Sequence, residues 1–143
     1  MAFLCGEFRH QIDEKGRVRI PAKLKACLDT DSIVCRGENC LYVFSGAEFS
    51  EMVNKFKNVP FSDTVAQASL RKFFASTYPL EEDSQGRTNL PQNLRNAVGL
   101  KKNIVSVGVL NRIEIWDEET YDKKDEKQNN FDEILETLKQ YGV

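Results

Sequence analysis

The sequence has 143 residues, of which 41% are hydrophobic and 29% are charged, and its formal net charge is −2. A chain of this length can bury about 70% of its unfolded surface in one compact fold. No apolar run approaches the ~20 residues that a membrane-spanning helix needs, which excludes an integral membrane protein of the helical kind. Charge appears already at Glu7, too early for a secretory signal peptide, so we expect a cytoplasmic protein.

The first predicted element is a strand over residues 6–12, in which apolar and polar side chains alternate. Phe8, His10 and Ile12 share one face of this strand. His10 is the only histidine of the chain, and no nucleophile or metal-ligand pair is spaced to meet it. We therefore interpret it as a half-buried residue beneath the next turn and not as a catalytic group.

A nine-residue segment that follows this strand occurs twice. Residues 13–21 read D-E-K-G-R-V-R-I-P, and residues 83–91 read D-S-Q-G-R-T-N-L-P. Both copies place an aspartate four residues before an arginine, a glycine directly before that arginine, and a proline at the end. The chain is therefore predicted to contain two similar units.

The residues that the two copies share have defined roles in a tight turn. Gly16 and Gly86 are expected to supply the positive φ that a hairpin loop of this length requires. Asp13 and Asp83 are expected to accept hydrogen bonds from turn amides, and each lies within reach of the arginine four residues later.

The first copy carries more positive charge than the second. After the turn, strand alternation places Val18 and Ile20 on one face and Arg17 and Arg19 on the other, with Lys15 at the turn itself. These cations predict a short basic ridge above an apolar floor. The wider segment over residues 9–25 holds six positive residues against two acids, whereas acids predominate after residue 117, so a basic edge can exist on an acidic protein.

The rest of the first unit contains a helix and a hairpin. We expect a short helix over residues 21–28, started by its proline, with Lys23 exposed. Strands are expected over residues 32–35 and 40–44, joined by a turn at residues 37–39.

Two helices are predicted between the units. The first covers residues 47–57, and the second begins after a cap at Ser62 or Asp63 and continues through Phe74. Their aromatic residues are expected to pack in the core or between subunits.

The second unit repeats this order of elements. Residues 78–82 lead into its turn. A helix is expected over residues 91–98, ending at Gly99, and strands are expected over residues 104–109 and 112–116. After a strongly charged stretch, Phe131, Ile134, Leu135 and Leu138 have helical spacing.

The predicted domain organisation follows from these elements. The first unit covers residues 5–47, a helical connector covers residues 48–75, the second unit covers residues 76–119, and a charged helical tail covers residues 120–143.

Catalysis and metal binding have little support in the sequence. Cys5, Cys27, Cys35 and Cys40 form no C-x-x-C pair and have no set of histidine partners, so we expect small core residues. The chain contains no nucleophile paired with a base and no glycine-rich phosphate loop. We expect no metal, no cofactor, no small-molecule substrate and no enzymatic activity.

The doubled D-x-x-x-R turn resembles the MraZ family. Each turn is followed by an aliphatic residue, a proline and a short helix, and residues 108–117 (G-V-L-N-R-I-E-I-W-D) extend the resemblance, which runs from Phe3 to about Tyr121. It implies a β-rich α+β fold of two tandem swapped-hairpin units, related to the AbrB and MazE antitoxin folds and arranged about a pseudo-twofold axis, with added helices between them and at the C-terminus.

The same resemblance implies a function. It implies ring-like homo-oligomers and a nucleoid-associated transcriptional regulator, which binds short repeats in the double-stranded DNA upstream of the cell-division and cell-wall gene cluster and of its own gene. The DNA-facing arginine of the first motif corresponds to Arg17, with Lys15 and Arg19 beside it, and that of the second motif corresponds to Arg87. Lys23 is a further candidate.

Physical chemistry agrees with this assignment, because arginine can bind a guanine edge bidentately and a β-ribbon fits the major groove. The second copy departs from the family pattern at residues 88–90 (T-N-L) and at Gln85, so we expect Arg17 to contribute more than Arg87. Two alternatives stay open. Each aspartate–arginine pair could be a salt bridge that only fixes its turn, and the chain could be an antitoxin-like or scaffolding interaction module.

Overall fold

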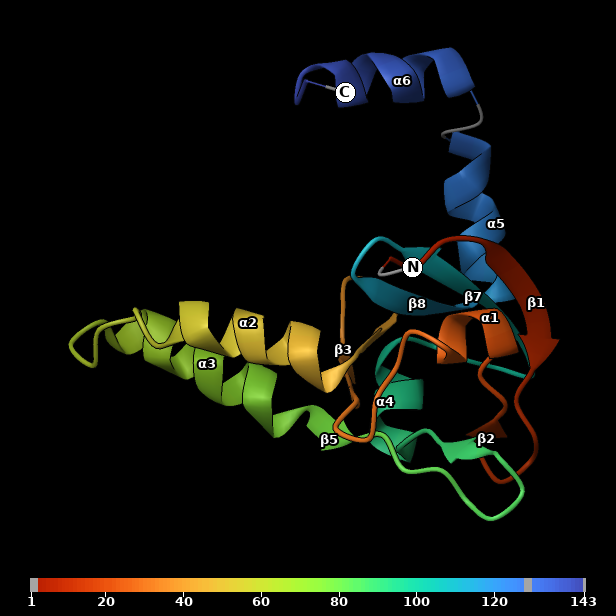
Figure 1. Cartoon of the computed structure of the whole chain (residues 1–143), viewed down its shortest axis with the longest axis horizontal. Helices are drawn as coiled ribbons and strands as arrows, with labels where there is room; N and C mark the ends of the chain where they lie inside the picture. The colour runs from red at the N-terminus through yellow and green to blue at the C-terminus, as the bar shows by residue number, and fades with distance from the viewer. Residues whose placement is uncertain (1–2, 128–129, 143) are drawn as a thin grey trace.

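The computed structural model describes residues 3–127 and 130–142 and has an α+β architecture (Figure 1). Its elements are, in chain order, β1 (Glu7–Gln11), β2 (Arg17–Val18), α1 (Ala22–Lys25), β3 (Ile33–Arg36), β4 (Leu41–Phe44), α2 (Gly46–Phe56), α3 (Thr64–Ala75), β5 (Thr77–Pro79), β6 (Thr88–Asn89), α4 (Gln92–Ala97), β7 (Asn103–Val109), β8 (Arg112–Asp117), α5 (Glu118–Lys127) and α6 (Phe131–Lys139).

The strands of the two repeats are interleaved in one sheet, with the hairpin of each repeat between strands of the other. A six-stranded antiparallel sheet has the order β1-β7-β8-β4-β3-β5, and β2 pairs with β6 in a separate two-stranded ribbon. In the sheet, β1 pairs with β7, β4 with β8 and β3 with β5, so each of these ladders joins one repeat to the other. If each strand is exchanged for its counterpart in the other repeat (β1 with β5, β3 with β7, β4 with β8), the same strand order results, read from the opposite edge of the sheet. Neither repeat therefore completes its sheet alone.

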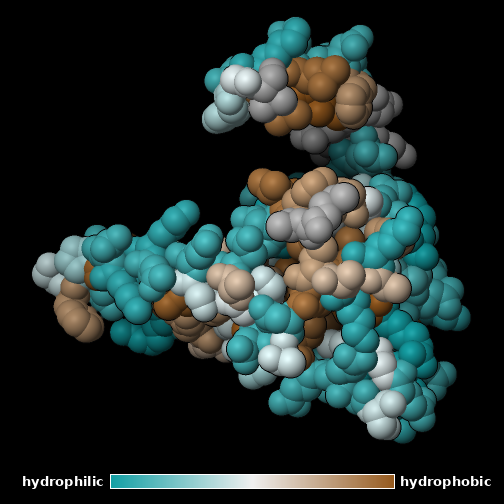
Figure 2. All heavy atoms as spheres, in the orientation of Figure 1, coloured by the Kyte–Doolittle hydropathy of each residue, from teal (hydrophilic) through white to brown (hydrophobic). Residues whose placement is uncertain are grey.

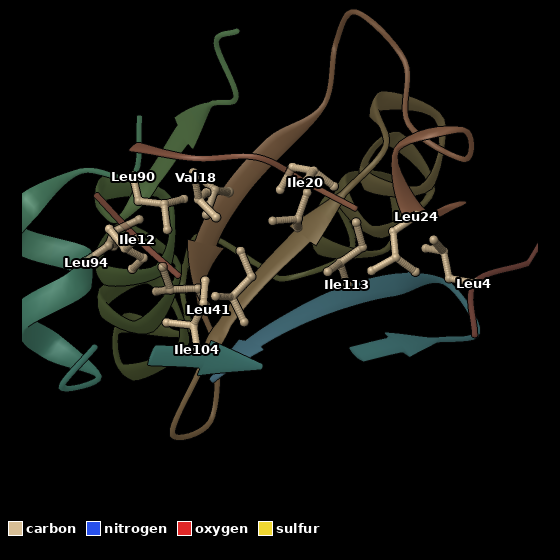
Figure 3. Close-up of a cluster of buried hydrophobic side chains, with 13 residues drawn as sticks. Leu4, Ile12, Val18, Ile20, Leu24, Leu41, Leu90, Leu94, Ile104 and Ile113 are labelled. Carbon is tan, nitrogen blue, oxygen red and sulfur yellow. The ribbon is translucent and has the colours of Figure 1, made fainter. Parts of the chain in front are cut away.

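The hydrophobic core is shared in the same way. Val18 and Leu24 of the first repeat pack in one cluster with Leu90 and Leu94 of the second, and each of these side chains is at most 1% exposed (Figure 3). Because this cluster contains side chains of both repeats, the apolar surface predicted beneath the first turn is formed by the two repeats together.

The two short helices after the turns begin later than predicted. Pro21 and Pro91 have ψ near 136° and so precede α1 and α4 as N-cap residues. The first helix also ends at Lys25 and not at residue 28, because the amides of Cys27 and Leu28 bond to carbonyls three residues back, in tighter turns. Gly99, with φ of 68°, follows the end of α4, as the sequence predicts.

Helices α2 and α3 form an arm that extends from the sheet (Figure 1). Asp63, one of the two predicted caps, accepts a hydrogen bond from the amide of Ala66 at the start of α3. The helices contact each other through neighbouring aromatic rings, including Phe49 and Phe73 with centroids 6.4 Å apart. None of the described residues of either helix is buried, so the arm has little support from the rest of this chain.

The C-terminal helices differ in how they contact the body. Helix α5 begins directly after β8, and its Tyr121 packs on Trp116 with ring centroids 5.9 Å apart. Helix α6 stands away from the sheet with an apolar patch exposed (Figures 1 and 2). Among the described residues, no helix has both the length and the apolar composition needed to cross a membrane.

The cysteines fit the sequence prediction only in part. Cys35 and Cys40 are fully buried in the sheet region, and burial raises the pKa of the Cys35 thiol to about 12. Cys5 is exposed, contrary to the prediction of a core residue, because successive side chains of extended backbone point to opposite sides and its neighbour Leu4, which bridges to Leu110, is the buried one. The described residues contain no cluster of His, Cys, Asp or Glu that could hold a metal ion.

Candidate nucleic-acid interface

The first repeated turn is fixed by one carboxylate. The Asp13 Oδ1 atom accepts hydrogen bonds from the amides of Lys15 and Arg17, each at 2.9 Å, and Oδ2 accepts from Arg17 Nε at 2.7 Å. Gly16 has φ of 79°, as predicted. The amide of Arg17, more than any other group, holds the pKa of Asp13 below its usual range. The turn therefore positions the arginine with the carboxylate ionised.

The second turn has the same geometry. The Asp83 Oδ1 atom accepts from the amides of Gln85 and Arg87 at 2.9 Å, and Oδ2 accepts from Arg87 Nε at 3.0 Å. Gly86 has φ of 78°. Both predicted aspartate–arginine pairs are thus confirmed. In each pair Nε faces the aspartate, which leaves the terminal nitrogens of the guanidinium available for a ligand.

The ribbon of β2 and β6 brings the two turns together. Its register pairs Arg17 with Asn89 and Val18 with Thr88. Val18 and Thr88 are 1% and 4% exposed and face inward, so Arg17 and Asn89 face outward. Carried one residue further, the same register places Arg19 across from Arg87. We call the outward side chains Arg17, Arg19, Arg87 and Asn89 the ribbon face.

The charge on this surface is divided differently from the charge in the sequence. The Arg19 guanidinium donates a hydrogen bond to the backbone carbonyl of Gln85, in the turn of the other repeat. Lys15 and Arg17 therefore lie toward one end of the ribbon, and Arg19 and Arg87 lie toward the other. The sequence suggests that the first copy is basic and that the second has fewer positive residues. Antiparallel pairing of β2 with β6 instead gives each end of the ribbon two cations.

The predicted site residues contribute unequally to this surface. One hollow beside the ribbon is lined by Lys15, Arg17, Arg87 and Asn89, together with acids of the second turn. Another is lined by Arg17, Arg19 and Arg87 with residues of β1. Arg17 and Arg87 line both hollows. Lys23 is exposed but lines neither, so the structure does not bring it into this cluster.

Two of the positive residues counted over residues 9–25 are neutralised by acids far away in the sequence. Arg9 forms a salt bridge with Asp122 of α5, with 2.8 Å between Nη2 and Oδ1, and Lys25 pairs with Glu82. These partners lie 113 and 57 residues along the chain, which sequence counting over a short window could not reveal. The basic edge is therefore narrower than the sequence suggests.

Sequence reasoning missed two residues of this region. Arg95 of α4 lies over Gly16 and donates from Nε to the Leu90 carbonyl at 2.9 Å. Asn89 occupies the outward position across from Arg17. The repeat could have indicated Asn89, because alignment of the two copies places Asn89 at the position that corresponds to Arg19.

The repeat that contains these two turns matches a known family of proteins. A family model described as "MraZ protein, putative antitoxin-like" matches residues 3–72 and, a second time, residues 73–141. The chain belongs to the MraZ family. A protein of Clostridium beijerinckii named "Transcriptional regulator MraZ" is 37% identical over 139 residues, which cover 96% of this chain and 98% of that protein. A protein of Clostridium botulinum with the same name is 36% identical over the same shares of both chains. Each of the two turns thus belongs to one of two tandem MraZ repeats.

Proposed function

We propose that this protein is a sequence-specific DNA-binding transcriptional regulator and that the ribbon face is its DNA contact surface. The observation that carries the proposal is the outward placement of Arg17 and Arg87 on one two-stranded ribbon, each held by an aspartate. The names of the two clostridial relatives support the same function. In this proposal no residue has a catalytic role, and no cofactor or small-molecule substrate is involved.

The proposed mechanism separates base reading from phosphate binding. The ribbon enters the major groove, where the terminal nitrogens of Arg17, Arg19 and Arg87 contact base edges. Lys15 and Lys23 bind phosphates, which positions the protein without reading sequence. Because Asp13 and Asp83 already restrict their arginines, less side-chain entropy is lost when DNA binds.

We also propose that the fold is of the swapped-hairpin kind found in AbrB and MazE, with a pseudo-twofold axis between the repeats. The interleaving of strands from both repeats in one sheet supports this. The proposed units are residues 5–47 and 76–119, with residues 48–75 as a helical connector and residues 120–143 as a charged tail.

We propose ring-like homo-oligomers in the cytoplasm, associated with the nucleoid. Exposed apolar side chains support self-association: Phe61 at the tip of the arm is 93% exposed, Val65 is 78% exposed and Phe131 of α6 is 66% exposed. A ring that presents several ribbons to repeated DNA boxes gains apparent affinity through effective concentration. From family membership, we propose that the boxes lie upstream of the cell-division and cell-wall gene cluster and of the gene for this protein.

A second candidate function is an antitoxin-like or scaffolding interaction module without sequence readout. The apolar face of α6, with Leu135 and Leu138 both more than 40% exposed, favours this alternative because it has no cover in the described part of the chain.

Fluorescence anisotropy with duplexes from the region upstream of the gene distinguishes the two functions. A regulator binds repeat-containing duplexes more tightly than scrambled ones, and its affinity falls steeply with salt. Equal affinity for both duplexes, insensitive to salt, would favour the interaction module. We expect Arg17→Ala to abolish specific binding with unchanged oligomer size by light scattering. Arg36→Ala, which removes an exposed arginine from β3, is the matched control and should bind as wild type.

A further inference from the structure

The ribbon face has one uncharged position. The repeat relates Arg17 to Arg87 and Arg19 to Asn89, so the two ends of the ribbon would be equivalent if residue 89 were an arginine. Arg19 lies across from Arg87 at one end, and Asn89 lies across from Arg17 at the other. The ribbon therefore presents two arginines at one end and an arginine beside a carboxamide at the other.

The backbone gives no reason for an asparagine at this position. Asparagine is disfavoured in strands and is common where φ is positive. Asn89 lies in β6, and the described non-glycine residues with positive φ are Asn39 and Leu110. Its side chain is exposed and forms no hydrogen bond to the residues that the structure describes. The carboxamide is thus free to contact a ligand.

The carboxamide fits one base edge better than the others. It offers an acceptor and a donor side by side, which match N6 and N7 of adenine in the major groove, whereas a guanidinium matches O6 and N7 of guanine. Residues directly opposite in an antiparallel ladder have Cβ atoms about 5 Å apart. This spacing allows Arg17 and Asn89 to reach neighbouring base pairs, which are separated by about 3.4 Å along the duplex.

We propose that Asn89 is a specificity-determining residue, which reads an adenine next to the base pair read by Arg17. The inference rests on the proposed DNA-binding function and deepens it. The DNA site is then asymmetric: the Arg17 and Asn89 end selects a guanine and an adenine, and the Arg19 and Arg87 end selects guanine alone.

Selection from a pool of random duplexes tests this role directly. The full-length wild type, Asn89→Ala and Asn89→Arg are each used to enrich binding sequences, which are then aligned. We expect Asn89→Ala to lose a preference for adenine of about ten- to a hundredfold at one position and to keep the remaining positions. Asn89→Arg should replace adenine by guanine at that position. Asn96→Ala, which removes an exposed asparagine of α4, should select the wild-type sequence.

The outcomes separate this inference from the function beneath it. If the wild type enriches a motif and Asn89→Ala enriches the same motif with the same preference at every position, the role of Asn89 is refuted and the regulator remains. If the wild type enriches no motif, both fail. Unchanged melting temperature and oligomer size of both variants show that a change in preference arises from contact with DNA.

Discussion

The guanidinium of Arg95 lies so close over Gly16 that a Cβ added to this glycine would come within 2.5 Å of it. A corresponding arrangement exists in the other turn, where a Cβ on Gly86 would lie 3.3 Å from a terminal nitrogen of Arg19. Each turn glycine is therefore covered by an arginine of the opposite repeat. The glycines are needed for their positive φ and also for this contact between repeats.

We expect Gly16→Ala to be more destabilising than Gly86→Ala. Both variants place a Cβ in the left-handed region, which costs about 1–2 kcal/mol. Gly16→Ala must also displace Arg95 from the Leu90 carbonyl, at a further cost of about 1 kcal/mol. Denaturant unfolding measures both variants. In an Arg95→Ala background the difference between them should largely disappear, and an undiminished difference would contradict this explanation.

Core truncation in either repeat should destabilise the whole protein. Leu24 and Leu94 are equivalent by the repeat, are each 1% exposed, and belong to one cluster. We expect Leu24→Ala and Leu94→Ala each to lower the free energy of unfolding by about 2–5 kcal/mol. Calorimetry should show one transition that moves as a unit in both variants. Two transitions, of which each variant shifts only its own, would mean that the repeats unfold independently.

Stability should decrease in mild acid because of His10. Its ring Nε2 lies 2.7 Å from the Ser106 hydroxyl, and burial lowers the pKa of His10 from its ordinary 6.5. The unfolded chain therefore takes up a proton near pH 6.5 while the folded protein does not. The contribution of His10 to the free energy of unfolding is therefore complete above that pH and is lost progressively as the pH falls below it.

The variant His10→Gln isolates this effect. It removes the titrating group, so its free energy of unfolding should change less between pH 7.5 and 5.5 than that of wild type. Urea unfolding at a series of pH values measures the slope. Parallel slopes for the two proteins would show that another group is responsible.

Lys15 should affect DNA affinity without affecting sequence preference. It is exposed at the first turn and has no acidic partner in the part of the chain that the structure describes. As a phosphate contact, its loss in Lys15→Ala should weaken binding to all duplexes by a similar factor and reduce the slope of log K against log salt by about 1. Lys57→Ala, at the exposed end of α2, provides the control. A changed base preference in Lys15→Ala would instead assign it a base contact.

Turns and helix caps of this fold were predictable from the sequence, but the pairing of its strands was not. The glycine and aspartate spacing predicts both turns correctly, and Asp63 is recognisable as a helix cap, because short-range chemistry determines these structures. Strand alternation indicates which face of β2 is buried. It does not indicate whether β2 pairs within its own repeat or with β6, because both arrangements satisfy the same pattern.

The error about charge at the candidate site has the same origin. The sequence shows Arg19 as a neighbour of Arg17 in a basic first copy, but pairing across repeats places it beside the second turn. Aligning the two copies shows that Asn89 corresponds to Arg19, but its position opposite Arg17 exists only after the ribbon has formed.

The pairing of strands across the two repeats also constrains when the protein can fold during synthesis. Glu7 of β1 pairs with Val107 of β7, so the first strand made waits for about 100 further residues before its partner exists. A ribosome that adds about 5–20 residues per second needs roughly 5 to 20 seconds for that interval. Until then β1 has no partner strand, and the edge of β4 that pairs with β8 stays open slightly longer, which exposes the nascent chain to chaperones and to pairing with strands of another copy.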